Sequence, residues 1–292
     1  MSGPTSFGDR LDAVFATRGR LCVGIDPHAS LLSEWGQSDS AEGVREFGLR
    51  VVEAAANHTG IVKPQVAFFE RHGAAGYAAL ERIIREARAA GLLVIADVKR
   101  GDIGSSVEAY GEAWLRPGSP LEADAMTISA YQGLGSIESV LVAAESANKG
   151  LFVLAATSNP EAAAIQRAVL QQSSRAGSTV AQAITSGVIA WNEGRADAAT
   201  RSFGSVGVVL GATNELSLAG IDTESEPSRP GLPVLAPGFG YQGAELSDFR
   251  RIYGALGPGV IVSESRSILG AGPDGIADAI ARRADEVGAA SA

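Results

Sequence analysis

Eight short apolar segments recur along this chain of 292 residues, and a stretch with helical character follows each of them. Short apolar runs bounded by turn residues are typical of buried β-strands. The predicted strands lie within 21–26, 60–68, 92–103, 123–129, 151–157, 205–211, 232–236 and 259–263. This alternation constrains the fold more strongly than any other feature of the sequence.

The intervening segments carry apolar residues at helical spacing. They predict helices over 7–17, 41–57, 70–90, 105–115, 136–148, 161–196 with a break near 173–177, 246–256 and 273–287. A helical turn and a connector rich in Ser, Glu and Pro fill 214–231. Pro64 lies inside the second predicted strand and argues mildly against that assignment.

Eight strand–helix units predict an α/β fold, namely a (β/α)₈ TIM barrel, and the chain has the length typical of one. We expect a single barrel domain over 1–292. The alternative is a doubly wound open sheet. No Gly-x-Gly-x-x-Gly turn follows the first strand, and the strand count reaches eight, so the barrel is favoured.

Charge and cysteine content narrow the class of partner. The net charge of −9 argues against nucleic acid or an anionic membrane as the main partner. Cys22 is the only cysteine and there are three histidines, which argues against a zinc site and fits a reducing cytoplasm. Because 1–10 has no apolar core and no apolar stretch approaches the length of a membrane span, we expect a cytoplasmic protein.

Charged residues are concentrated at the end of the third predicted strand. Asp97 and Lys99 are two residues apart and therefore share a face, while Asp102 lies on the following turn. An unpaired buried charge is costly, and alternating acids and amines compensate one another in part. An isolated Asp-x-Lys pair is equally compatible with a structural ion pair, so the rest of the chain must decide.

In (β/α)₈ barrels the catalytic groups lie at the carboxyl ends of the strands, and phosphate is often bound by the loops after strands seven and eight. The loop 237–244, which includes Gly240 and Gln242, is rich in glycine and lets backbone N–H groups approach an anion. Arg266 follows strand eight and offers a bidentate fork to phosphate. Polar residues at or near strand ends are Asp26, Lys63, Asp97, Lys99, Ser129 and Ser158.

Together these motifs carry a resemblance. The pattern Asp97-x-Lys99-x-x-Asp102, with Lys63 on the second strand, resembles the orotidine 5′-phosphate decarboxylase family in its longer bacterial form. Supporting matches are found at 24–27, 62–65, 96–103, 157–160, 237–240 and 266–268. The set as a whole is specific, whereas each motif alone is not.

The resemblance implies a role for each matching position. Asp97 and Lys99 would face the scissile carboxylate, Lys63 would lie between them and the ribose, and Asp102 would reach into the site of the partner subunit of a homodimer. The implied substrate-binding residues are Asp26 and Ser106 for ribose, Ser158 for the pyrimidine ring, and Gly240, Gln242 and Arg266 for phosphate.

The implied reaction explains these residue types. Loss of carbon dioxide from C6 of the pyrimidine leaves an in-plane carbanion that the ring cannot delocalise, so fixed charge must stabilise it. The Lys99 ammonium can do so and then supply its proton, and neither a cofactor nor a metal is expected.

Two alternatives remain open from the sequence. Related sugar-phosphate decarboxylases and aldolases keep Asp-x-Lys-x-x-Asp but bind magnesium, and they tend to have an acid where Lys63 stands. A non-catalytic barrel that binds a nucleotide would need the phosphate loops but not all four charged residues.

Overall fold

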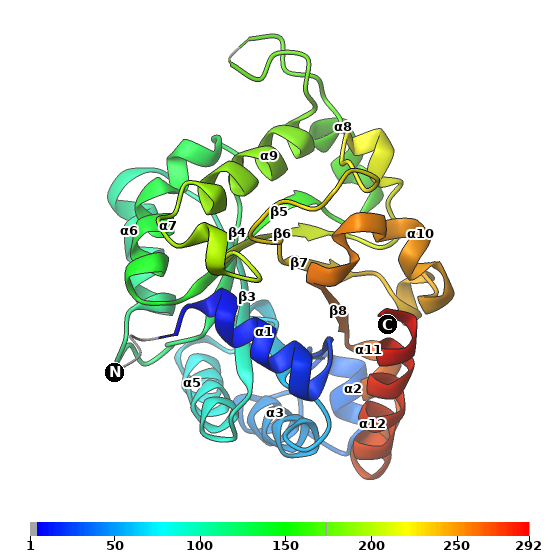
Figure 1. Cartoon of the computed structure of the whole chain (residues 1–292). Helices are drawn as coiled ribbons and strands as arrows, with labels where there is room; N and C mark the ends of the chain where they lie inside the picture. The colour runs from blue at the N-terminus through cyan, green and yellow to red at the C-terminus, as the bar shows by residue number, and fades with distance from the viewer. Residues whose placement is uncertain (1–4, 173, 292) are drawn as a thin grey trace.

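Eight parallel strands close into a barrel in the computed structural model, which describes residues 5–172 and 174–291 (Figure 1). Each strand pairs with the next along the chain, and β8 pairs with β1. The strands are β1 Leu21–Ile25, β2 Ile61–Pro64, β3 Leu93–Arg100, β4 Ala125–Ile128, β5 Gly150–Ala156, β6 Val206–Leu210, β7 Val234–Pro237 and β8 Val260–Glu264. The predicted (β/α)₈ barrel is confirmed, and the doubly wound sheet is excluded.

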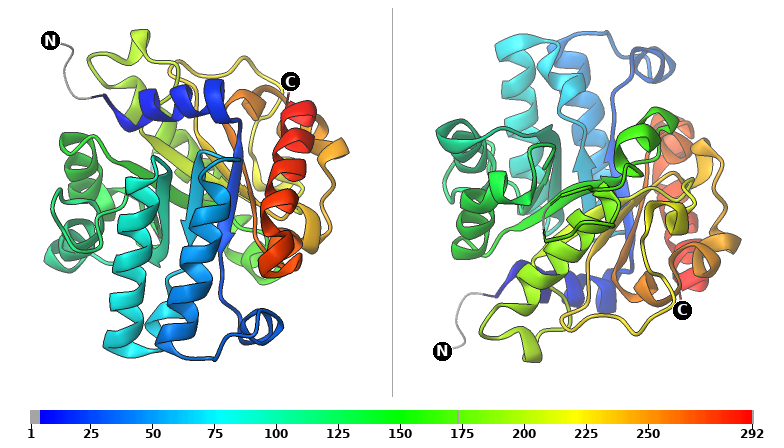
Figure 2. Two further views of the ribbon diagram at one scale, coloured as in Figure 1. Left: turned by 90° about the horizontal axis from the view of Figure 1, so that it is seen from below. Right: turned by 90° about the horizontal axis from the view of Figure 1, so that it is seen from above.

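Helices surround the barrel and run alongside its strands (Figure 2). The α-helices are α1 Phe7–Arg18, α2 Ala29–Glu34, α3 Ala41–Ala55, α4 Ala67–Glu70, α5 Gly73–Ala89, α6 Gly104–Leu115, α7 Glu138–Ser146, α8 Ala163–Gln166, α9 Val180–Glu193, α10 Phe249–Tyr253, α11 Arg266–Leu269 and α12 Gly272–Ser291. Short 3₁₀ turns are η1 Leu134–Ile137, η2 Pro160–Ala162, η3 Ala198–Thr200, η4 Leu216–Ala219, η5 Gly240–Gln242, η6 Leu246–Asp248 and η7 Gly254–Gly259. Within the described ranges, no helix has both the length and the apolar character needed to cross a membrane.

Helix α1 closes the amino-terminal end of the barrel, where Figure 2 shows it in dark blue. Phe7 is fully buried and meets Phe152 of β5 edge to face, with ring centroids 6.0 Å apart. Gly150 makes room for it, because a Cβ at that position would lie 2.5 Å from the Phe7 ring. The barrel floor is therefore plugged by an aromatic side chain, and only the opposite end can open to a ligand.

A network of ion pairs supports the barrel near this floor. The Lys149 ammonium lies 2.7 Å from the Glu122 carboxylate, and Arg88 lies 2.6 Å from the same oxygen. Arg10 of α1 pairs with the buried Asp124 at 2.5 Å. Burial would raise the pKa of Glu122, but interactions that include the hydrogen bonds from Lys149 and Arg88 outweigh burial and lower this pKa to about 2. The carboxylate is thus charged at neutral pH and tied to two cations.

Several expected boundaries are wrong for physical reasons. The second strand ends at Pro64 instead of reaching 68, because proline has no N–H to continue the ladder and the chain turns into α4. The helix expected over 246–256 breaks at Gly254, whose φ of 44° ends α10 in a 3₁₀ turn.

The helical stretch expected over 161–196, with a break near 173–177, is interrupted over a longer segment than predicted. Only the α-helices α8 and α9 form there, and residues 167–172 and 174–179 make an irregular arm that projects from the barrel (Figure 1). Ile165 of α8 and Val169 of the arm are each 51% exposed, so little apolar surface is buried that could stabilise a continuous helix. Thr179 then caps α9 by accepting a hydrogen bond from the Gln182 N–H. One residue of the expected break, 173, lies outside the described residues.

Candidate active site

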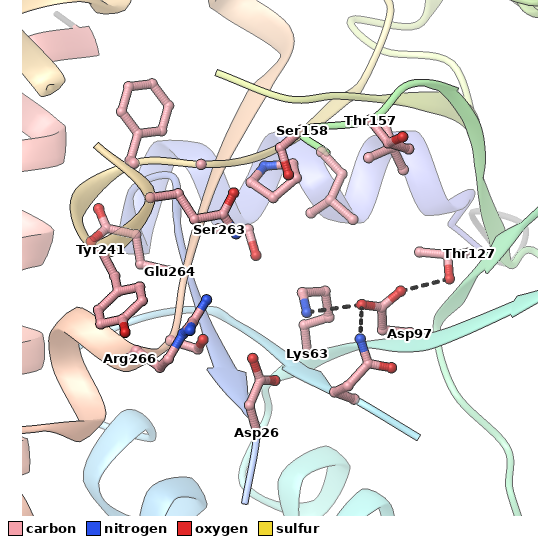
Figure 3. Close-up of a pocket in the computed structure, with 18 of the residues that line it drawn as sticks. Asp26, Lys63, Asp97, Thr127, Thr157, Ser158, Tyr241, Ser263, Glu264 and Arg266 are labelled. Atoms are coloured by element: carbon pink, nitrogen blue, oxygen red, sulfur yellow. Dashed lines mark hydrogen bonds and ion pairs between the residues drawn. The ribbon is translucent and has the colours of Figure 1, made fainter. Parts of the chain in front are cut away.

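A cavity of about 390 Å³ opens at the carboxyl ends of the strands, opposite the plugged floor. Its wall combines a charged cluster from β2 and β3 with polar loops after β5, β7 and β8 (Figure 3). The lining residues are Asp26, Lys63, Gln65, Asp97, Lys99, Thr127, Leu154, Thr157, Ser158, Asn159, Val209, Leu235, Pro237, Gly238, Phe239, Tyr241, Gln242, Ser263, Glu264, Ser265, Arg266 and Ser267.

Asp97 is the centre of the charged cluster. Its Oδ2 atom accepts hydrogen bonds from Lys99 Nζ at 2.5 Å, Gln65 Nε2 at 2.8 Å and Lys63 Nζ at 3.2 Å. Its Oδ1 atom accepts one from Thr127 Oγ1 at 2.8 Å, and Figure 3 shows Asp97 between Lys63 and Thr127. Strands β2, β3 and β4 therefore all contribute to holding this one carboxylate.

The pKa values in the cluster follow from burial and from the opposing charges. Burial by itself would raise the pKa of Asp97, but Lys63 and Lys99 outweigh it and hold the pKa well below its usual range. Burial would lower the pKa of Lys63, yet the charges of Asp97 and Asp26 raise it above its ordinary value. Burial lowers the pKa of Lys99, with Asp97 working in the opposite direction. Lys99 is thus the ammonium that releases a proton more readily.

Backbone geometry at the end of β3 is irregular. The register pairs Ala96 with Met126 and Arg100 with Ile128, so three residues of β3 face the single residue Thr127 of β4. Within this bulge Lys99 has φ of 50°, in the left-handed region that non-glycine residues rarely adopt. Such a conformation costs on the order of 1–3 kcal/mol and persists only where surrounding contacts fix it.

Asp26 follows β1 and faces the same cavity. Figure 3 shows its carboxylate between Lys63 and Arg266. Its Oδ1 atom is buried, and no group in the described part of the chain donates a hydrogen bond to it. A buried carboxylate oxygen without a donor is costly, so a ligand hydroxyl that enters the cavity can satisfy it.

The opposite end of the cavity is suited to an anion. Gly238 and Gly240 in the loop after β7 have φ of 119° and 66°, so the loop needs glycine at both positions. The Arg266 guanidinium lies 3.8 Å from the centroid of the Tyr241 ring, which stacks against it. Its hydrogen-bonding edge is then free to make a bidentate contact with phosphate.

A buried acid supports the two anion-binding loops from below. Glu264, at the end of β8, accepts hydrogen bonds from Ser267 Oγ and from Arg283 Nε, each at 2.6 Å. A Cβ at Gly240 would lie 2.6 Å from Glu264 Oε2, so the loop after β7 packs directly on this carboxylate. Arg283 compensates the negative charge of Glu264, which would otherwise oppose anion binding.

The family assignment follows from comparison with known proteins. The model of the orotidine 5′-phosphate decarboxylase / HUMPS family matches residues 19–279. The chain belongs to this family. Orotidine 5′-phosphate decarboxylase of Salinispora tropica is 47% identical over 93% of this chain and 92% of its own length. That of Nocardioides sp. is also 47% identical, over 96% of this chain and 98% of its own.

A solved structure agrees with this assignment. A crystal structure of a Streptomyces avermitilis protein matches with a TM-score of 0.89 and 44% identity, over 99% of this chain and 97% of that one. The resemblance of the sequence motifs to orotidine 5′-phosphate decarboxylases of bacterial form is therefore confirmed at the level of the family.

The fold brings most of the residues expected from the family motifs into one cavity. Those that line it are Asp26, Lys63, Asp97, Lys99, Ser158, Gln242 and Arg266. Gly240 lies in the loop beside the cavity, but it is not a lining residue. Asp102 and Ser106 do not line it either: Asp102 is half-buried on the turn after β3, and Ser106 is exposed on α6.

Four residues of the cavity have no role assigned from the family motifs, and their contacts are seen only in the structure. Gln65 and Thr127 bind Asp97, Tyr241 stacks on Arg266, and Glu264 supports the glycine loop. Gln65 is two residues after Lys63 and shares its strand face, so the sequence spacing could have indicated that Gln65 lies at the same site. Thr127 had no comparable signal, because its partners lie on another strand.

Proposed function

We propose that the chain, as one barrel domain over 1–292, decarboxylates orotidine 5′-phosphate to uridine 5′-phosphate, acting as a carboxy-lyase in de novo pyrimidine biosynthesis. The observation that carries this proposal is the geometry of one cavity with a Lys63–Asp97–Lys99 cluster at one end and Arg266 beside a glycine loop at the other. The 47% identity to proteins named orotidine 5′-phosphate decarboxylase supports the same substrate.

Lys99 is the proton donor in this proposal. The bond between C6 and the carboxylate breaks, carbon dioxide leaves, and the electron pair remains on C6 in the plane of the ring. The ammonium at Lys99 stabilises this charge and then transfers its proton to C6, after which solvent reprotonates the amine. The lowered pKa of Lys99 favours the transfer.

Asp97 holds this ammonium in place and lies close to the position of the substrate carboxylate. Repulsion between the two carboxylates is relieved as carbon dioxide leaves, but we assign the larger effect to Lys99 because it acts on charge that develops in the transition state. Lys63 contacts the same oxygen of Asp97 as Lys99 does, and its charge keeps Asp97 ionised.

Binding of the phosphate supplies the remaining stabilisation. Enzymes lower barriers by up to about 23 kcal/mol, which exceeds what one lysine provides, so contacts far from C6 must organise the site. We assign phosphate to Arg266, Gln242 and the loop around Gly240, and a ribose hydroxyl to the unsatisfied oxygen of Asp26. We assign recognition of the pyrimidine ring to Ser158, which lines the same cavity.

A homodimer completes the site in this proposal. Asp102 lies outside the cavity of its own chain, and its carboxylate accepts a hydrogen bond from the neighbouring Ile103 N–H at 2.9 Å. Ile103, next to Asp102, is 60% exposed, and Tyr131, in the loop after β4, is 76% exposed, so two large apolar side chains are available for a second copy to cover. A second copy docked on this face can receive Asp102 in its own cavity, with Ser106 beside the ribose.

No metal or cofactor takes part in the proposed reaction. The cation beside the reacting carbon is the Lys99 ammonium, and Lys63 occupies the place where a magnesium-dependent relative would need an acid. Among residues 5–172 and 174–291, no three His, Cys, Asp or Glu side chains are grouped so as to hold a metal ion. We place the activity in the cytoplasm, since the only cysteine, Cys22, is a buried free thiol.

A direct assay tests the function. Purified protein, treated exhaustively with a chelator, is mixed with orotidine 5′-phosphate, and the loss of absorbance is followed. We expect turnover without added metal. Activity that returns only with magnesium would favour the sugar-phosphate relatives, and nucleotide binding without turnover would favour a non-catalytic barrel.

A further inference from the structure

We propose that Thr127 is a positioning residue, whose single hydroxyl fixes both the backbone of Lys99 and the rotation of the Asp97 carboxylate. This inference rests on the proposed function, because it concerns the same cluster. Thr127 lies on β4 and is 1% exposed. It is uncharged and is not one of the charged residues that carry the reaction.

The hydroxyl makes two hydrogen bonds whose directions are fixed by chemistry. The Lys99 backbone N–H can only donate, and it donates to Thr127 Oγ1 at 3.0 Å. The ionised Asp97 can only accept, so the hydroxyl proton points to Asp97 Oδ1 at 2.8 Å. One side chain thus acts as acceptor for the first partner and donor to the second.

The backbone contact explains how the unusual conformation of Lys99 is held. Backbone groups of successive strand residues face opposite neighbours, and Asp97 O accepts from the Val66 N–H just after β2, so in a regular continuation the Lys99 N–H would also face β2. The bulge between Ala96 and Arg100 interrupts the ladder, and Lys99 adopts φ of 50° at that point. The bulge turns this N–H toward β4, where Thr127 Oγ1 accepts it, so Thr127 fixes the residue whose ammonium must meet C6.

The carboxylate contact sets the orientation of Asp97. Lys99, Gln65 and Lys63 all converge on Oδ2, whereas Thr127 is the one partner of Oδ1 recorded within the described ranges. Three contacts to one oxygen leave the carboxylate able to turn about its Cβ–Cγ bond. The hydroxyl of Thr127 prevents that turn and keeps Oδ2 directed at Lys99.

The test compares variants that differ by this hydroxyl. Thr127→Val keeps the shape of the side chain and removes both hydrogen bonds. Thr127→Ser keeps the hydroxyl and Thr127→Ala lacks it, and neither residue is β-branched, so comparing these two variants isolates the effect of the hydroxyl. Thr185→Val is the matched control, since Thr185 is also buried and donates its hydroxyl to Ala181 O within α9, away from the cavity. Each variant is assayed for kcat and KM with orotidine 5′-phosphate, for Kd with uridine 5′-phosphate by calorimetry, and for its melting temperature.

We expect kcat to fall about 10- to 100-fold in Thr127→Val and Thr127→Ala, because hydrogen bonds to charged groups have this magnitude. In these two variants KM and the uridine 5′-phosphate Kd should change less than about threefold, because positioning is lost and ground-state binding is not. Thr127→Ser keeps the hydroxyl, so its kcat should stay within about threefold of the wild-type value. Unchanged kcat in Thr127→Val, or an equal loss in Thr127→Ser and Thr127→Ala, overturns the assignment.

Crystal structures of wild type and Thr127→Val give a readout independent of turnover. We expect the Asp97 carboxylate to rotate or Lys99 Nζ to shift by about 1 Å, a displacement large enough to impair catalysis. A cluster that does not move overturns the positioning role. A wild-type protein that fails to decarboxylate orotidine 5′-phosphate refutes the proposed function instead, and the structural comparison still decides the role of Thr127.

Discussion

Subunit complementation tests how the active site is divided between two chains. Lys63 and Lys99 both contact Asp97 within one chain, while Asp102 lies outside that chain's cavity. If a partner supplies Asp102, each site of the homodimer uses Lys99 from one chain and Asp102 from the other. The Lys99→Ala and Asp102→Ala homodimers should therefore each be nearly inactive.

Mixing the two variants should restore activity by a predictable amount. A mixed dimer has one site that lacks both groups and one site with both intact. Random exchange makes half of the dimers mixed, and half of their sites are whole, so activity should approach about a quarter of the wild-type value. The assay is turnover of orotidine 5′-phosphate after exchange, with the mixed species quantified by native mass spectrometry.

The structure also supplies a matched control for this experiment. Lys63 and Lys99 both bind Asp97 Oδ2 of the same chain, so a mixture of Lys99→Ala and Lys63→Ala leaves one defect in every site. That mixture should regain no activity. If Lys99→Ala and Asp102→Ala exchange subunits yet stay inactive, Asp102 serves its own chain and the shared site is refuted.

Two further predictions concern binding and stability. Arg266→Ala should weaken nucleotide binding in calorimetry far more than Lys99→Ala does, because Arg266 contacts phosphate in ground and transition states alike. Lys99→Ala, in contrast, should abolish turnover. Equal losses of affinity in the two variants would remove Arg266 from the site. The pKa of Glu122 is lowered to about 2, so the folded state gains stability from its charge above the ordinary value of 4.5 and loses it as pH falls toward 2. The excess unfolding free energy of wild type over Glu122→Gln in urea should thus shrink between about pH 5.5 and about pH 3.5, and a constant difference would contradict the ion-pair explanation.

Much of the fold is encoded locally and could be predicted from the sequence. Apolar runs of strand length and helical periodicity are properties of neighbouring residues, so all eight strands were located to within a few residues. The charged residues at the end of β3, the glycine loop after β7 and Arg266 after β8 were found for the same reason. Barrel closure then places the ends of all strands around one cavity.

The errors arose where burial and not propensity decides the structure. The alanine-rich sequence that begins at residue 161 favours a helix, but only 163–166 form α8 before the exposed arm at 167–172 and 174–179, where side chains such as the 51% exposed Val169 bury too little apolar surface to stabilise a helix. Phe7 is the converse case: its helix was predicted, but its position beneath Phe152 depends on the space left by Gly150 on a distant strand.

The sequence by itself determined the barrel, the cluster of Asp97 and Lys99, and the loops that can bind phosphate, because each depends on residues close together in the chain. Only the tertiary structure decided that Thr127 supports both Asp97 and Lys99, and that Asp102 does not line the cavity of its own chain. Contacts between strands depend on their register. A bulge in β3 changes that register by two residues, and no local pattern of apolar and polar residues encodes which side chain will lie opposite it.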